Sequence, residues 1–126
     1  LLIPYTCGRM GPFKDNRLLE LIIMTEITSI TDWKKNIMDS NFLLLITKES
    51  CEDCREVERY LENHDYRIDE YDIKKINLDN LESKKLIESM EWIKIEVDYV
   101  PFWSLIIDSI RVKSIKGNIE LVKEIL

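Results

Sequence analysis

The feature that most constrains this 126-residue chain is a short apolar run followed closely by a pair of cysteines. Phe42 to Ile46 is a run of apolar residues, which is typical of a strand buried on both faces of a sheet. After a short loop, Ser50 stands where a helix N-cap is expected, and Cys51-Glu52-Asp53-Cys54 opens the helix with an acidic first turn. A buried strand that leads into a helix carrying two cysteines indicates an α/β fold with a redox motif.

The remaining sequence alternates between helical and strand-like spacing. We expect helices after Ser29, after Ser50 and after Asp79 or Asn80, and the third of them carries Leu86, Ile87, Met90 and Ile93. Strands are expected around Ile73 to Leu78, at Phe102 to Ile107 and at Ile110 to Lys116. A final helix is expected after Gly117-Asn118, with Ile119, Val122 and Leu126. The first two strands are joined by a helical crossover and should be parallel, whereas the last two form an antiparallel hairpin. The sequence therefore predicts a four-stranded mixed sheet with helices on both faces.

The first 23 residues differ from the rest of the chain. They hold two of the three prolines and two of the three glycines, and charged residues interrupt their apolar patch, so they do not have the pattern of a signal peptide. We expect residues 1–23 to be an N-terminal extension of doubtful origin, with Met24 as an alternative start, and residues 24–126 to be one domain. Cys7 lies in the extension without a partner motif and is expected to be an incidental thiol. The missing signal peptide favours the cytoplasm.

Composition excludes several classes of function. The net charge of -6 argues against a protein built to neutralise nucleic-acid phosphates or anionic lipid. No apolar run reaches the roughly 20 residues of a membrane span. Three Cys and one His are too few for a closed structural zinc site or a disulfide-stapled mini-protein. We therefore expect a monomer without a metal, a nucleic-acid partner or a membrane partner.

The spacing of Cys51 and Cys54 carries the chemistry. A helix N-terminus offers unpaired N–H groups and partial positive charge, which favour the thiolate, and the thiolate is the species that attacks a disulfide. Cys51, at the very start of the helix, is expected to be the exposed nucleophile. Cys54, one turn further, is expected to be more buried and to resolve the mixed disulfide. Such a pair needs no bound cofactor besides its own redox-active disulfide.

A second motif, Val97-Asp98-Tyr99-Val100-Pro101, precedes the strand that begins at Phe102 and suits a cis-proline turn at the end of the sheet. Together with the C-x-x-C helix, the crossover, the hairpin and the last helix, it resembles the thioredoxin superfamily over about residues 27–126. The resemblance implies a thioredoxin-like fold and a thiol-disulfide oxidoreductase of cell redox homeostasis. It also implies that Pro101 binds substrate, with Val100 supplying backbone groups. Tyr99, next to Val100, is a candidate substrate contact.

The branch of the superfamily is left open by the motifs. Lys48, three residues before the first cysteine, resembles the glutaredoxin lysine that assists glutathione binding, but the glutaredoxin Gly-Gly pair is reduced here to Lys116-Gly117. The thioredoxin branch places a tryptophan just before the first cysteine and a buried acid six residues before it, and this chain has Ser50 and Leu45 there. Arg55, directly after the second cysteine, fits the thioredoxin branch.

Glu52 and Asp53, between the cysteines, should tune the pair. Two carboxylates close to a sulfur disfavour its negative charge, so they are expected to set a more reducing couple, and they would repel the carboxylates of glutathione. Arg55 is a further residue expected to tune the pair. Our interpretation is a thioredoxin-like enzyme that reduces protein disulfides and is recycled by a reductase. The alternatives are a glutathione-dependent glutaredoxin-like enzyme and a redox-inactive interaction or metal–sulfur binding module of the same fold.

Overall fold

The computed structural model describes residues 24–117, 120 and 122. In that part of the chain the elements follow the order β1 (Thr25–Glu26), α2 (Ile30–Asp39), β2 (Phe42–Thr47), α3 (Glu52–Glu62), β3 (Arg67–Ile68), β4 (Tyr71–Asn77), the 3-10 helix η1 (Leu81–Ser83), α4 (Lys84–Ser89), α5 (Glu91–Glu96), β5 (Phe102–Ile107) and β6 (Ile110–Lys116). The predicted extension 1–23, with Cys7, lies outside the described residues. So do Ile119 and Leu126 of the predicted last helix, whereas Glu120 and Val122 are helical.

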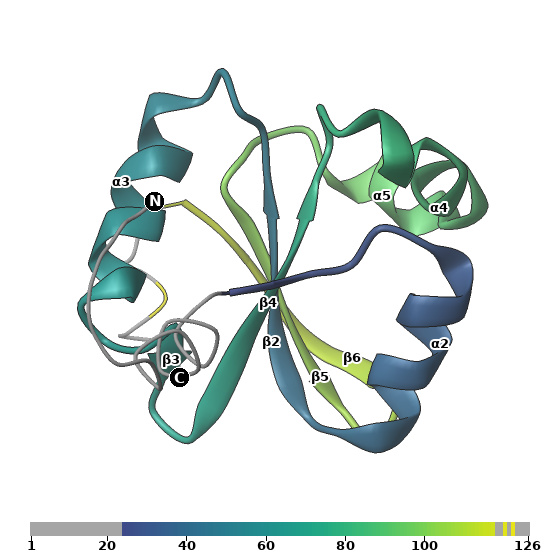
Figure 1. Ribbon diagram of the computed structural model, residues 1–126, viewed down its shortest axis with the longest axis horizontal. Coiled ribbons are helices and arrows are strands. Elements are labelled where there is room, and N and C mark those ends of the chain that lie inside the picture. Colours follow the sequence, from purple (N-terminus) through teal and green to yellow (C-terminus); the bar gives the residue numbers. More distant parts are fainter. Residues whose placement is uncertain (1–23, 118–119, 121, 123–126) are drawn as a thin grey trace, which may run out of the picture.

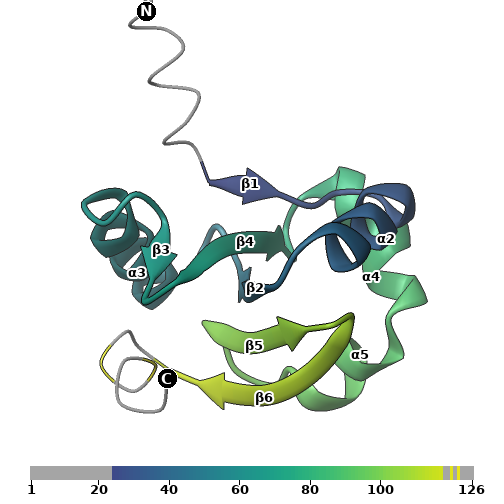
Figure 2. The ribbon, with the colours of Figure 1, turned by 90° about the horizontal axis from the view of Figure 1, so that it is seen from below.

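One mixed sheet runs through the middle of the molecule (Figures 1 and 2). Its strands lie in the order β1-β4-β2-β5-β6, and β3 pairs with β4. β2 is parallel to β4, because α3 carries the chain back across one face, and antiparallel to β5, which continues into β6 through a hairpin. The predicted sheet has four strands, whereas the described part of the chain forms six. The two additional strands, β1 and β3, are two residues long, too short to leave a periodicity in the sequence.

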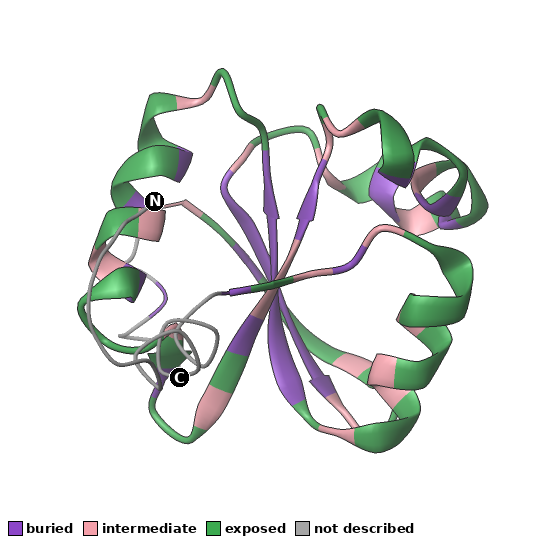
Figure 3. Ribbon diagram, in the orientation of Figure 1, coloured by how far each residue is buried: buried purple, intermediate pink, exposed green. Residues whose placement is uncertain are grey.

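Helices cover both faces of the sheet, as predicted. α3 lies on one face and α2, α4 and α5 lie on the other (Figure 1). β2 is the central strand, and each of its residues from Phe42 to Thr47 is buried (Figure 3), which confirms a strand covered on both sides. Among the described residues, no helix combines the length and the apolar character needed to cross a membrane.

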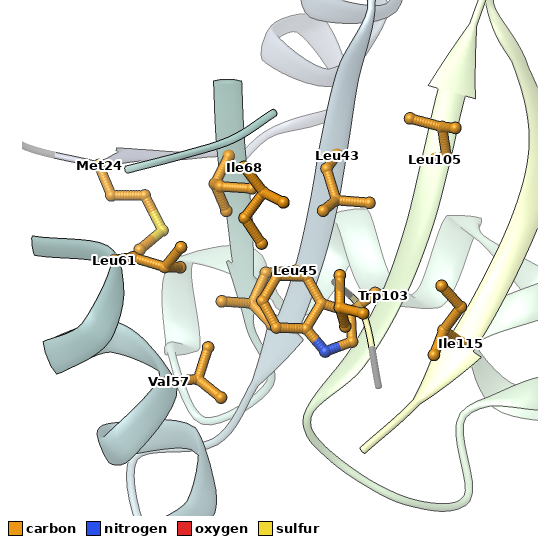
Figure 4. Close-up of a cluster of buried hydrophobic side chains, with 11 residues drawn as sticks. Met24, Leu43, Leu45, Val57, Leu61, Ile68, Trp103, Leu105 and Ile115 are labelled. Carbon is orange, nitrogen blue, oxygen red and sulfur yellow. The ribbon is translucent and has the colours of Figure 1, made fainter. Parts of the chain in front are cut away.

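Alternating side chains of β2 enter two hydrophobic clusters. Leu43 and Leu45 pack with Val57 and Leu61 of α3 and with Trp103 of β5 (Figure 4), while Phe42, Leu44 and Ile46 face the other helices. Trp103, whose face the sequence leaves undecided, is therefore on the α3 face. It is completely buried, and its indole Nε1 donates a hydrogen bond of 2.9 Å to the Gly117 carbonyl oxygen. Burial of the indole on the α3 face excludes it from the opposite side of the sheet.

The segment after β4 differs from the prediction in three ways. Leu78 follows the strand instead of belonging to it, because β4 ends at Asn77. The side chain of Asn80 accepts a 3.0 Å hydrogen bond from the Glu82 N–H and so caps η1 rather than a long helix. The single predicted helix is two short ones, because Met90 has an extended backbone between α4 and α5. Both short helices pack on the same cluster, so their apolar spacing matches that of one helix.

Candidate active site

Both cysteines of the motif lie at the N-terminus of α3, where the chain leaves the central strand. The sequence predicts Ser50 as the N-cap of α3, but in the structure Cys51 is the N-cap. The Cys51 Sγ accepts a hydrogen bond of 3.1 Å from the Cys54 N–H. The reason is geometric: a cap side chain must reach an N–H two or three residues further along, and here the sulfur does so. The Cys51 sulfur therefore faces the unpaired N–H groups of the first turn.

The two thiols have different environments. Both are free, but Cys51 is half-buried whereas Cys54 is completely buried. Burial is the largest cause that raises the pKa of the Cys54 thiol to about 12. The side-chain hydrogen bond with Cys51 and the negative charge of Glu58 raise this pKa further, whereas a backbone hydrogen bond with Lys48 lowers it. At neutral pH the Cys54 sulfur consequently carries its proton.

The loop before β5 comes against the first cysteine. The Cys51 Sγ lies 3.7 Å from the Val100 carbonyl oxygen, and the peptide bond between Val100 and Pro101 is cis. Tyr99 is half exposed, and its hydroxyl donates a hydrogen bond of 3.4 Å to the Asp53 carboxylate. The fold thus brings Tyr99 and Val100, which the sequence singles out as substrate contacts, to the first turn of α3.

The charged residues around the motif divide between solvent and the loop. Glu52 and Asp53 are exposed, and the acidic first turn is where the sequence places it. Arg55 does not turn toward the cysteines: its guanidinium donates a hydrogen bond of 2.9 Å to the Glu49 carbonyl oxygen. In this position Arg55 holds the loop between β2 and α3.

A cavity of about 440 Å³ opens beside α3, on the same face of the sheet. Lys48 lies in its wall, and the other walls come from α3, the ends of β1, β2 and β4, and the loop residues Glu49 and Tyr66. The sequence groups Lys48 with Val100 and Pro101 as substrate contacts, whereas the structure puts it in this cavity wall, which those two residues do not line.

Two residues of this cavity are missed by sequence reasoning. Lys75 of β4 donates a hydrogen bond of 2.8 Å to the Glu58 carboxylate of α3. The sequence leaves the register of the Lys74-Lys75 pair open, and Glu58 has the spacing of a solvated helix face. The ammonium of Lys74 instead bonds Asn36 and Ser40 on the opposite face of the sheet. The available signal is the four-residue separation of Cys54 and Glu58, which places both on one side of a helix.

Among the described residues, neither His64 nor the acidic side chains form a metal centre. The sequence predicts His64 as a residue of the helix end, and its imidazole Nδ1 lies 2.9 Å from the Tyr60 carbonyl oxygen, with the two rings stacked. Within residues 24–117, 120 and 122, no group of three or more His, Cys, Asp or Glu side chains is arranged to hold a metal ion.

Comparison with known proteins identifies the fold. No protein-family model matches the sequence, and no curated protein matches it either. Thioredoxin f from spinach chloroplast is 19% identical over 81% of this chain and 88% of its own, with a TM-score of 0.61. Thioredoxin from Trypanosoma brucei brucei is 15% identical over 82% of this chain and 88% of its own, with a TM-score of 0.64. A chain of the complex between ferredoxin:thioredoxin reductase and thioredoxin f2 is 18% identical over 83% of this chain and 94% of its own, with a TM-score of 0.61. This chain has the thioredoxin fold, as the motifs predict.

Proposed function

We propose that this chain of thioredoxin fold is a thiol-disulfide oxidoreductase that reduces protein disulfides with Cys51 and Cys54. The observation that carries the proposal is the position of the Cys51 sulfur. It caps α3, is half-buried, and lies 3.1 Å from the Cys54 amide and 3.7 Å from the Val100 carbonyl oxygen. Backbone N–H groups at a helix N-terminus favour an attacking thiolate at this position.

The difference between the two thiols supports a division of roles. The Cys51 thiolate attacks one sulfur of a substrate disulfide, forms a mixed disulfide and releases the other sulfur as a thiolate. Cys54, buried one turn further along α3, then attacks the Cys51 sulfur and releases the second substrate thiol. Two electrons pass from the pair to the substrate, and a Cys51–Cys54 disulfide remains. A reductase then returns the pair to the dithiol, with no bound cofactor.

The geometry around Cys51 favours a protein substrate. The Val100 backbone lies against the sulfur, so an extended substrate segment can bond the loop at Val100 and Pro101 while its disulfide meets Cys51, and Tyr99 can contact the same segment. One of the similar structures is a complex of ferredoxin:thioredoxin reductase with thioredoxin f2, which supports protein partners. Glutathione is the less favoured substrate because Lys48, the residue proposed to contact it, lines the cavity beside α3 instead.

The decisive experiment is a disulfide-reduction assay with insulin as substrate and dithiothreitol as reductant. We expect the Cys51→Ser variant to fall to the uncatalysed rate, because serine cannot form the mixed disulfide. Cys7→Ser is the matched control: it also removes one thiol but should keep the wild-type rate. Equal rates for Cys51→Ser and the wild type would rule out the proposed function.

A further inference from the structure

We infer that a groove beside the loop at Val100 and Pro101 holds an apolar side chain of the substrate protein, a few residues from its reacting cysteine. The inference rests on the proposed function, because it names the class of substrate segment that the same site prefers. We call this surface the α5 groove. It has a volume of about 350 Å³ and is lined by Ile95, Glu96, Asp98, Phe102, Ser114 and Lys116.

The α5 groove adjoins the loop that lies against the first cysteine. Asp98 of its wall precedes Val100 by two residues, and Phe102 of its wall directly follows Pro101. The Cys51 Sγ lies 3.7 Å from the Val100 carbonyl oxygen, so a substrate cysteine that reacts with this sulfur is next to the same loop. An extended segment advances about 3.3 Å per residue, so a substrate residue about two or three positions from its cysteine reaches the groove.

Ile95 is the exposed apolar residue of the groove. It is 76% exposed, whereas Ile93 of the same helix is buried and anchors α5 on the sheet. The packing of α5 therefore does not depend on the Ile95 side chain. Phe102 adds a second apolar residue to the lining. An apolar substrate side chain that covers Ile95 is favoured, because both groups lose contact with water.

The charged residues of the groove are paired within the chain. Lys116 forms an ion pair of 2.6 Å with Asp98, and the Glu96 carboxylate accepts hydrogen bonds of 2.6 and 3.2 Å from Arg111. Arg111 also donates a hydrogen bond of 3.3 Å to the Ser114 hydroxyl. A charged substrate side chain would compete with these pairs, whereas an apolar one leaves them intact. The groove consequently favours an apolar residue over a charged one.

Contacts of β6 fix the shape of the groove. α5 lies beside β5 and β6 (Figure 2), and the Arg111 guanidinium lies 3.9 Å from the centroid of the Trp92 ring while it bonds Glu96 of the same helix. At the end of β6, Gly117 donates a hydrogen bond of 2.9 Å to the Pro101 carbonyl oxygen. A groove that keeps its shape without a ligand loses less freedom when a substrate binds, which favours affinity.

Contacts in the groove should raise the reaction rate of extended substrates. Binding energy from a side chain remote from the reacting sulfur increases the rate constant, provided that the disulfide also meets Cys51. A small disulfide without a peptide segment reacts at the same sulfur but has no side chain to place beside Ile95. A comparison of the two kinds of disulfide therefore separates the groove from the chemistry of the dithiol.

Two peptide disulfides provide the test, in a Cys7→Ser background with protein in excess. Each peptide has one cysteine joined to thionitrobenzoate, and the second and third positions on both sides of that cysteine are leucine in one peptide and serine in the other. When the Cys51 thiolate attacks the peptide sulfur, thionitrobenzoate leaves as a coloured thiolate. Rates with glutathione as the attacking thiol correct for the reactivity of each peptide. We expect the parent to react about tenfold faster with the leucine peptide.

Replacement of Ile95 should remove this preference. In Ile95→Ser we expect the ratio of the two rate constants to fall below about threefold, with the loss on the leucine peptide, because less apolar surface is covered. Ile95→Val keeps an apolar side chain and should keep most of the preference. Ile110→Ser is the matched control, since Ile110 is 62% exposed at the start of β6 and does not line the groove. It should behave like the parent.

Several outcomes would overturn the inference. These are an undiminished preference in Ile95→Ser, a parent that reacts equally with both peptides, an equal loss in Ile110→Ser, and an Ile95→Ser variant that is slowed equally with both peptides. Dithiobis-nitrobenzoate, a small disulfide, shows in each variant whether the dithiol itself still reacts. If the parent reacts with this reagent and with both peptides no faster than glutathione does, the proposed function fails, and not only the role of the groove.

Discussion

Cys51 and Cys54 are three residues apart and lie in different chemical environments. Cys51 is at the surface end of α3, where its sulfur accepts the Cys54 N–H, and Cys54 is completely covered by the protein. Burial is also the largest cause of the raised pKa of Cys54. This raised pKa makes the stability of the fold depend on pH, because in the unfolded chain the same thiol is in water and has its ordinary pKa.

The reduced protein should lose stability as the pH rises above 9.0. In the unfolded chain Cys54 loses its proton near the ordinary pKa of 9.0, whereas the folded protein keeps it up to about pH 12. Between these values the folded state binds more protons, so the free energy of unfolding falls with pH, by at most about 1.4 kcal/mol per pH unit. Urea unfolding of the reduced protein at several pH values above 9.0 measures this slope. Cys54→Ala should flatten it and Cys7→Ala should not; equal slopes in the two variants would contradict the prediction.

At the scale of elements, the helices are anchored in different ways. α3 buries Cys54, Val57 and Leu61, whereas α2 has no completely buried residue. α2 is attached through half-buried side chains, and Trp33 meets the ring of Phe42 edge-on with centroids 6.2 Å apart. A helix with so little buried surface depends on its local signals more than α3 does.

The N-cap of α2 should therefore contribute measurably to stability. The Ser29 Oγ accepts a hydrogen bond of 3.0 Å from the Asp32 N–H. Ser29→Ala should lower the free energy of unfolding by about 1 kcal/mol, because that N–H then has no partner within the helix. Urea denaturation provides the measurement. Thr31→Ala, an exposed position in the first turn of the same helix, is the control and should be neutral or slightly stabilising.

The loop that carries Val100 is held by two contacts from the end of β6. Lys116 of β6 forms an ion pair of 2.6 Å with Asp98, and its hydrogen bond lowers the pKa of that carboxyl. Gly117, just after β6, donates a hydrogen bond of 2.9 Å to the Pro101 carbonyl oxygen. The hairpin thus positions the loop against Cys51, although neither strand contains a residue of the dithiol.

At the scale of the whole molecule, the central strand joins the two clusters. Leu45 is completely buried, has β4 and β5 on its two sides, and packs with α3 and Trp103 (Figure 4). The position at which the motifs of the thioredoxin branch imply a buried acid is therefore part of the apolar core. The acidic residues beside the dithiol are Glu52 and Asp53 in the first turn of α3, and none of them comes from the strand.

Truncation of Leu45 should destabilise the entire fold. Leu45→Ala removes three carbons from a packed core and should lower the free energy of unfolding by about 2–5 kcal/mol. The loss should appear as one cooperative transition, because the side chain touches both the sheet and α3. Met38→Ala, at a side chain that is 78% exposed, is the comparison and should change stability by less than about 0.5 kcal/mol. Similar losses in both variants would mean that the sheet centre is not the core.

The sequence by itself determined the local features of this protein. The apolar run of β2, the helix that carries Cys51 and Cys54, and the hairpin of β5 and β6 follow from periodicity and breaker residues that lie within a few positions of each other. The parallel pairing of β2 with β4 follows from the helical crossover between them. Each of these predictions uses information contained in one short segment or one connection.

Only the tertiary structure decided which side chains meet across segments. It selected Cys51 over Ser50 as the cap of α3, interrupted the predicted third helix at Met90, and brought Lys75 to Glu58. Strand side chains alternate between the two faces, so a shift of one residue in β4 would have sent Lys74 toward α3 and Lys75 toward α2. That register depends on the pairing of β4 with β2 and on the packing of α3, which no single segment of the sequence contains.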